Sequence, residues 1–222
     1  MFQTLQTPQA PKLFMIQLGG RPKGRLIEQH DMFFGVAEHI SELIPAINEH
    51  WPEVKNKWHI DSYREVTKVG EYQISWADAL GSNSSSSSAP IDVAKDNEQA
   101  LKLFFINLGG YLPNDFEEYH HKLLIVAPTQ ADAIKQAKQS EFYKKFTFKD
   151  KDTPFNAASH VDDKRQVDVD EIYQVDSLLP SGQLLITPID NTDLTGEPAC
   201  EDKVFVGYLS IKSLNKWRDD GI

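Results

Sequence analysis

The sequence predicts an α+β protein made of two tandem β-β-α-β-β repeats with mostly antiparallel sheets, related by a pseudo-two-fold axis. The main observation is an internal duplication. The run KLFMIQLGG at 12–20 returns as KLFFINLGG at 102–110. An E-x-H motif follows each run, and an H-[IV]-D motif follows further along each copy. A second observation is a low-complexity stretch between the copies, where a tether belongs.

The duplication also sets the predicted domain organisation. The stretch between the copies contains five consecutive serines, which bury no apolar surface and cannot offset the entropy cost of their own ordering. Each copy is small for a self-sufficient core, so we expect either that the two copies pack together or that each has a small core of its own. The predicted segments are a flexible tail at 1–11, repeat copy one at 12–78, a Ser-rich linker at 79–99, repeat copy two at 100–177 and a C-terminal extension at 178–222.

Copy one is expected to contain four strands and one helix. Its first strand is almost continuously apolar, which is typical of a strand buried on both faces, and Gly/Pro turn residues follow it. Apolar residues then recur at helical spacing from Ile40 to Trp51, with Ser41 as the expected N-cap. Later runs of β-forming residues, separated by a predicted tight turn at Val69-Gly70-Glu71, indicate two more strands. The predicted strands are 12–18, 30–37, 59–67 and 72–76.

Copy two is expected to follow the same order. Thr129-x-x-Asp132 resembles a capping box and places the start of its helix. An insertion around 149–158 precedes its third strand. Its predicted elements are strands at 102–108, 120–127, 160–169 and 172–176 and a helix at about 130–145. The extension, which has no counterpart in copy one, is expected to form strands at 184–187 and 204–211 and a short helix at 213–218.

Composition limits the classes of function. The net charge of −10 and the pI of about 5.1 argue against nucleic acid or an anionic membrane surface as a partner. Cys200 is the single cysteine, so an internal disulfide is excluded. Residues 1–12 lack the pattern of a signal peptide, and no apolar run approaches the ~18 residues of a membrane span. We therefore expect a cytoplasmic protein.

The motifs L-G-G, E-x-H and H-[IV]-D, in this order and in both copies, resemble the family known as domain of unknown function 1543. The resemblance covers roughly residues 12–76 and 102–177. It implies a bacterial protein with the domain present as a tandem pair, and it implies no reaction. Copy two departs from the pattern, because His121 stands where copy one has Asp31.

The recurring polar residues are the candidates for chemistry. Residues two apart on a strand point to the same face, so each E-x-H and each H-x-D forms an imidazole–carboxylate pair. If the second and third strands lie near each other, one copy gathers two histidines and two carboxylates. That set suits general acid–base catalysis or a zinc-like site, whereas the alternative is that each histidine caps a strand. The candidates are Glu28, His30, His59 and Asp61 in copy one and Glu118, His120, His160 and Asp162 in copy two.

A basic loop follows the first strand of copy one. Arg21, Lys23 and Arg25 lie on this glycine-containing loop and are candidates for binding an anion, although solvated loop charges are the simpler interpretation. The loop is not a P-loop, because it lacks the required glycine and lysine spacing. Copy two has acidic residues in the corresponding region. If either copy binds an anion, we therefore expect it to be copy one.

These observations leave two hypotheses about function. The first is a cytoplasmic, non-catalytic binding or interaction module whose partner is a small molecule or a protein. The alternative is a small-molecule enzyme that uses the paired histidines and carboxylates for acid–base or metal-assisted chemistry on an anionic substrate. No metal ligand set and no cofactor is assigned from the sequence.

Overall fold

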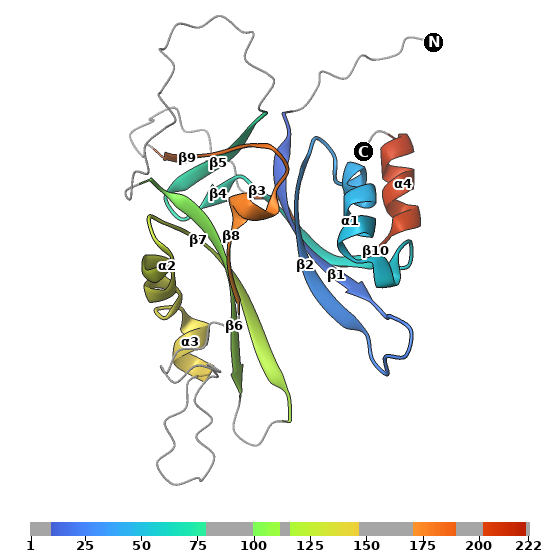
Figure 1. Ribbon diagram of the computed structural model, residues 1–222, viewed down its shortest axis with the longest axis horizontal. Coiled ribbons are helices and arrows are strands. Elements are labelled where there is room, and N and C mark those ends of the chain that lie inside the picture. The colour runs from blue at the N-terminus through green and yellow to red at the C-terminus, as the bar shows by residue number, and fades with distance from the viewer. Residues whose placement is uncertain (1–9, 79–99, 112–115, 147–170, 190–201, 221–222) are drawn as a thin grey trace, which may run out of the picture. The chain divides into compact units, whose positions relative to one another are not determined.

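The computed structural model describes residues 10–78, 100–111, 116–146, 171–189 and 202–220 (Figure 1). The chain divides into two compact units. Unit 1 comprises Met1–Gly81 with Leu179–Ile222, and unit 2 comprises Ser82–Leu178. Both units combine helices with sheets whose described strand pairs are antiparallel, so the α+β prediction is confirmed. The linker at 79–99, the tail up to residue 9 and Cys200 lie outside the described residues.

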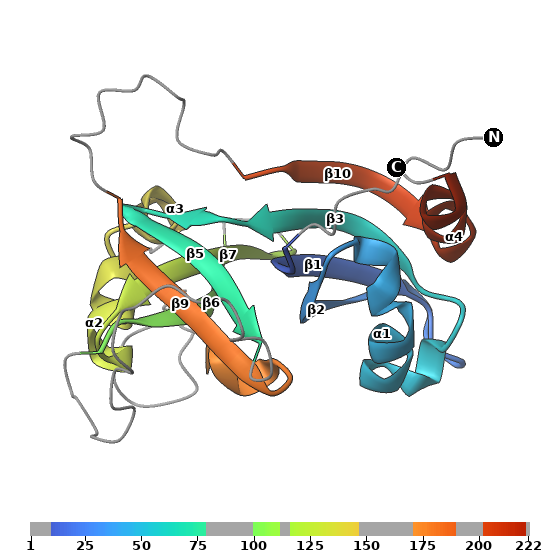
Figure 2. The ribbon, with the colours of Figure 1, turned by 90° about the horizontal axis from the view of Figure 1, so that it is seen from above.

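A four-stranded sheet forms the centre of unit 1. The strand order is β10-β3-β1-β2, and β10 runs alongside β3 in Figure 2. The apolar run at the first L-G-G motif forms β1, which lies between two neighbours and is buried along most of its length. The edge strand β10 comes from the C-terminal extension. The strands are β1 (Lys12–Gly20), β2 (Gln29–Ala37), β3 (His59–Val66) and β10 (Val204–Ser210).

Helices cover one face of this sheet (Figure 1). The predicted helix from Ile40 to Trp51 divides into a 3₁₀ turn, Ile40–Leu43, and α1, Ile44–His50. Ser41 is not the N-cap, because His39 takes that position and accepts a hydrogen bond from the Ser41 N–H. A second 3₁₀ turn, Pro52–Val54, and α4, Ile211–Asp220, follow. The fully buried core residues include Phe14, Ile16, Leu18, Ile47, Val54, Ile60 and Leu214.

Unit 1 also contains a second sheet of three strands, in the order β4-β5-β9. Gly70 has a φ of +58°, a left-handed conformation that suits glycine, and it forms the tight turn between β4 and β5. The predicted strand at 184–187 is part of β9, which pairs with the whole of β5. The strands are β4 (Lys68–Val69), β5 (Tyr72–Asp78) and β9 (Gly182–Pro188).

Unit 2 is a three-stranded sheet with helices packed on it, in the order β7-β6-β8. Thr129 is the N-cap of α2, as the capping-box motif predicts, and its side chain accepts from the Asp132 N–H. Ala133 and Ala137 are fully buried, so α2 lies close to the sheet. The elements are β6 (Lys102–Tyr111), β7 (Glu118–Ala127), α2 (Gln130–Ala137), α3 (Glu141–Phe146), β8 (Glu171–Gln174) and a 3₁₀ turn, Val175–Leu178.

The two N-terminal hairpins share one register. Lys12 pairs with Ala37 in β1–β2, and Lys102 pairs with Ala127 in β6–β7. The third strands differ, because 171–174 occupies the place beside β6 that β3 occupies beside β1. The strand at 171–174 therefore takes the place of a third strand, whereas the repeat pattern predicts that 172–176 is a fourth strand equivalent to β5. The predicted strand at 160–169 and the insertion at 149–158 lie outside the described residues.

Candidate functional site

A glycine between two histidines is the base of the site. Gly19 on β1 pairs with His30 on β2 and with His59 on β3. Two strands that flank a third lie about 10 Å apart, so their side chains normally meet only over a small residue. A β-carbon at residue 19 would clash with the His59 ring and would lie 2.8 Å from Asp61 Oδ2. The missing side chain therefore lets polar groups from β2 and β3 converge over β1.

Four sequence-predicted residues meet above Gly19 and form what we term the His–carboxylate cluster: Glu28, His30, His59 and Asp61. His59 Nε2 lies 3.1 Å from Asp61 Oδ1 and 3.4 Å from Glu28 Oε1. His30 Nε2 lies 3.3 Å from Asp61 Oδ2 and 3.7 Å from Glu28 Oε2. The Nε2 of each imidazole thus lies within 3.7 Å of both carboxylates, and the four side chains close a ring.

The cluster has a buried side and an open side. The His59 side chain is 8% exposed and that of Asp61 is 28% exposed, whereas those of Glu28 and His30 are 45% and 50% exposed. Asp61 Oδ2 is buried and accepts no hydrogen bond from the described part of the protein. A buried carboxylate oxygen without a donor is costly, so this atom is a polar group that the described chain leaves unsatisfied.

Tyr208 extends the site along the edge strand. Its ring lies against that of His59, with centroids 4.3 Å apart and planes tilted by 31°. The Tyr208 side chain remains largely exposed, as does that of Val206. Sequence reasoning missed Tyr208, because β10 belongs to the extension and nothing in the repeat pattern places it beside β3.

In unit 2 the structure describes two of the four candidate residues, Glu118 and His120. His120 pairs with Gly109 as His30 pairs with Gly19, and His120 Nε2 lies 3.9 Å from Glu118 Oε2. His160 and Asp162 lie outside the described residues. The strand β8 pairs with Phe104 to Asn107, and the residues before Glu171 lie outside the described part of the chain.

His121, which replaces Asp31 of the first copy, stacks on Phe142 with centroids 5.2 Å apart. Burial, and then the charge of Lys122, lower the pKa of His121. The imidazole thus packs against an aromatic ring, and among the described residues it forms no pair with a carboxylate.

The three cations of the predicted anion loop are exposed. Arg25 N–H donates to Pro22 O over 3.2 Å, and Gly24 has a φ of +86°, so the loop is a tight turn. In the described ranges, Arg21, Lys23 and Arg25 form no ion pair with the His–carboxylate cluster. The anion-binding role of this loop therefore stays a prediction.

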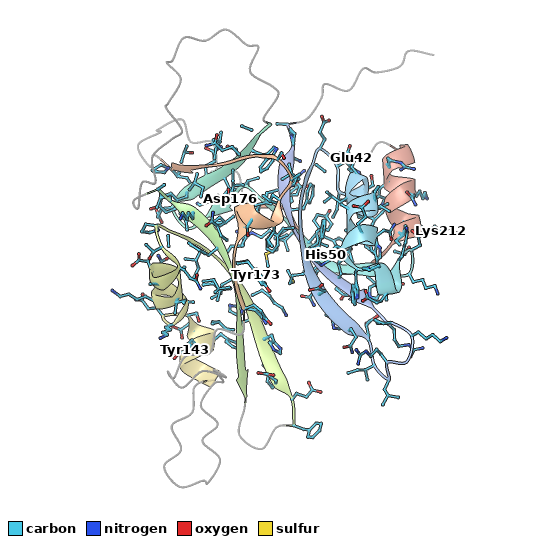
Figure 3. The ribbon with its side chains drawn as sticks, viewed as in Figure 1. Glu42, His50, Tyr143, Tyr173, Asp176 and Lys212 are labelled. Carbon is cyan, nitrogen blue, oxygen red and sulfur yellow. The ribbon has the colours of Figure 1, made fainter. Side chains whose placement is uncertain are left out.

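A further acid–histidine pair lies next to the cluster in sequence. His50 Nε2 is 2.9 Å from Asp31 Oδ2, and His50, labelled in Figure 3, is the last residue of α1. The hydrogen bond to Asp31 raises the pKa of His50. Partial burial works to raise the pKa of Asp31, but hydrogen bonds from His50 and from the Met32 N–H hold it below its usual value. This pair ties the end of α1 to β2.

Metal binding finds no support in the described side chains as they are arranged. Across these parts of the chain, no group of three or more His, Cys, Asp or Glu residues is placed to hold a metal ion, the cluster included.

The fold and the site define a two-unit α+β protein with a His–carboxylate cluster on the main sheet of unit 1. Residues 25–76, which run from the basic loop into β5, match the family described as Domain of Unknown Function (DUF1543). The match confirms the resemblance indicated by the E-x-H and H-[IV]-D motifs. It includes all four cluster residues. The tandem arrangement of two such domains stays a prediction.

A solved structure, that of protein Il1583 from Idiomarina loihiensis, is similar to this chain with a TM-score of 0.52. The similarity covers 90% of this chain and 98% of that chain at 20% identity, so it shows the fold alone. None of the curated proteins matches the sequence. The described helices include none that is long and apolar enough to cross a bilayer.

Proposed function

We propose that the His–carboxylate cluster of unit 1 is the site of a small-molecule enzyme that works by general acid–base transfer. The observation that supports this is the closed ring of contacts, in which each imidazole Nε2 lies 3.1–3.7 Å from both carboxylates. Such a ring places two imidazoles, the side chains most often used for general acid–base catalysis, against the same two carboxylates.

The two histidines take different roles because their exposure differs. His30 is half exposed, so its imidazole exchanges a proton with the bound substrate. His59 is enclosed beneath Tyr208 and holds the carboxylates of Asp61 and Glu28 against the His30 ring. The substrate is a small anion, because the loop that carries Arg21, Lys23 and Arg25 leads directly into Glu28.

A second candidate, the non-catalytic binding or interaction module, is supported by a different observation. The edge strand β10 carries three exposed large apolar side chains at every second position: Val204, Val206 and Tyr208. Exposed apolar side chains grouped on a sheet edge are typical of surfaces that bind a partner. In either case we place the protein in the bacterial cytoplasm, with no nucleic acid or membrane as its partner.

The experiment that separates these functions is a metabolite-library screen with two readouts, thermal shift for binding and mass spectrometry for conversion. We expect wild type to bind and convert an anionic metabolite, and His30→Gln and His59→Gln to lose the conversion. His120→Gln is the matched control, because it changes the equivalent register position in unit 2. Conversion that persists in both unit 1 variants would overturn the proposal.

Two further outcomes are informative. A metabolite that binds without being converted, or a screen with no hit of either kind, favours the interaction module over the enzyme. Elemental analysis of the purified protein tests the chemistry: a stoichiometric divalent metal that is lost in Asp61→Asn would replace metal-free acid–base transfer with a metal-assisted mechanism.

A further inference from the structure

A lysine-lined groove lies in unit 1 away from the His–carboxylate cluster. It has a volume of about 580 Å³ and is formed where the start of β1, the end of β3 and the sheet of β4 and β5 come together. We propose that this groove binds a small organic anion with an apolar body, such as an aryl or alkyl carboxylate or sulfonate. The cluster contributes none of the groove's residues, so the proposal is independent of the proposed function.

The size and walls of the groove suit a small molecule. Pockets for small ligands typically measure about 300–1,000 Å³ and combine apolar walls with a few polar groups. Here Pro11 and Ile189, both partly exposed, are apolar residues of the lining. They would contact the hydrocarbon part of the ligand.

The charge of the groove is opposite to that of the protein. Three lysines, Lys12, Lys68 and Lys203, line it, and the lining contains no Asp or Glu. The whole chain carries a net charge of −10, so an all-cationic lining is not what random placement of charges produces. Lys12 Nζ pairs with Glu65 Oε2 at 2.9 Å. Lys68 and Lys203 form no ion pair with any described residue and supply the free positive charge.

The backbone that carries these two lysines is held by a single carboxylate. Asp202 accepts hydrogen bonds from the Thr67 N–H and the Lys68 N–H, at 2.7 and 2.9 Å, and it pairs with Arg64. The Glu65 N–H donates to Lys203 O over 2.9 Å. Because the negative charge of Asp202 is compensated by these donors, it fixes the position of the lysines without cancelling their attraction for an anion.

The groove is also remote from the cluster. Lys12 and Leu13 lie at the start of β1, and Gly19 lies six residues further along the strand. At a rise of about 3.3 Å per residue, the two sites are about 20 Å apart. A molecule bound at one site therefore does not displace one bound at the other.

The test uses calorimetric titration of the full chain with naphthalene-2-sulfonate. Lys68→Gln/Lys203→Gln removes the free charge of the groove, and Lys55→Gln/Lys57→Gln is the matched control, since both lysines are exposed elsewhere in unit 1. We expect one equivalent to bind wild type, with the affinity reduced about tenfold in the groove variant and at most about twofold in the control. Added salt should weaken binding to wild type. Thermal unfolding of both double variants checks that they are folded.

Two other probes test the two parts of the ligand class. The uncharged 2-naphthol should bind at least about tenfold more weakly than the sulfonate, because it lacks the charge. Inorganic phosphate should also bind more weakly, because it lacks the apolar body. Equal affinity of wild type and the groove variant for the sulfonate would overturn the site. If 2-naphthol or phosphate bound wild type as tightly as the sulfonate does, the proposed ligand class would be wrong.

Discussion

Gly19 lies directly beneath the imidazole of His59, at a position where any β-carbon would collide with that ring. The two residues pair across β1 and β3, and His30 pairs with the same glycine from the other side. The first glycine of the L-G-G motif therefore has a structural role in unit 1. It leaves the space in which histidines from two non-adjacent strands reach the same pair of carboxylates.

Gly19→Ala tests this relationship. The new methyl group must displace His59 and Asp61, both of which are held by the rest of the cluster, so we expect a loss of about 1–3 kcal/mol in the free energy of unfolding. We also expect the NMR signals of the His30 and His59 rings to shift together. Gly20→Ala is the control, because its β-carbon would face Val54 at 3.2 Å on the helix-covered side of the sheet. Unchanged ring signals in Gly19→Ala would contradict the arrangement.

The Asp31–His50 pair predicts a pH-dependent contribution to stability. Folding raises the pKa of His50 above 6.5, so its contribution is complete below that pH and is lost as the pH rises through the folded-state pKa. Folding lowers the pKa of Asp31 below 3.8, so its contribution is complete above that pH and is lost as the pH falls through the folded-state pKa. The pair should therefore stabilise unit 1 most between these two values.

Urea unfolding of Asp31→Asn against wild type measures this contribution. Both side chains are more than one third exposed, so we expect the variant to be less stable by at most about 1 kcal/mol at pH 5. The difference should shrink as the pH rises through the folded-state pKa of His50. Glu53→Gln, an exposed carboxylate with no such partner in the described chain, should show no pH-dependent difference. If the difference in the free energy of unfolding between wild type and Asp31→Asn grew at high pH, the predicted pH dependence would be wrong.

Asp202 is predicted to be the most important charged residue of unit 1 for stability. It accepts hydrogen bonds from Thr67 N–H and Oγ1, from Lys68 N–H and from Arg64. Asp202→Ala leaves these partners unsatisfied, and we expect a loss of about 2–4 kcal/mol in the free energy of unfolding. Glu71→Ala, at an exposed turn, serves as the control. An effect of Asp202→Ala no larger than that of Glu71→Ala would show that the network is not a structural anchor.

Thr129→Ala tests the helix cap of unit 2. Thr129 Oγ1 accepts from the Asp132 N–H and donates to Asp132 Oδ2 at 2.6 Å, so the substitution removes both bonds at the start of α2. We expect a loss of about 1 kcal/mol, measured by chemical unfolding. Thr129→Ser keeps the hydroxyl and should retain most of the stability. If the serine and alanine variants lose the same amount, the hydroxyl is not the stabilising group.

Local patterns in the sequence were sufficient for the elements that depend on neighbouring residues. The apolar run of residues 12–18, the turn at Gly70 and the cap at Thr129 were all predictable, because burial, left-handed backbone and capping each leave a short-range signal. The helix beginning at Ile40 was predicted too long, since periodicity does not distinguish a 3₁₀ turn from an α-helical one.

The sequence by itself determined which residues form the His–carboxylate cluster, because both E-x-H and H-x-D place their members on one face of a strand. The tertiary structure decided the rest. Strand order put β2 and β3 on either side of Gly19, and it brought Tyr208 and Asp202 from the extension to the edge of the same sheet. The contacts of Tyr208 and Asp202 join residues more than a hundred positions apart. No local pattern encodes them, because their energy comes from burial and hydrogen bonds that exist only in the folded chain.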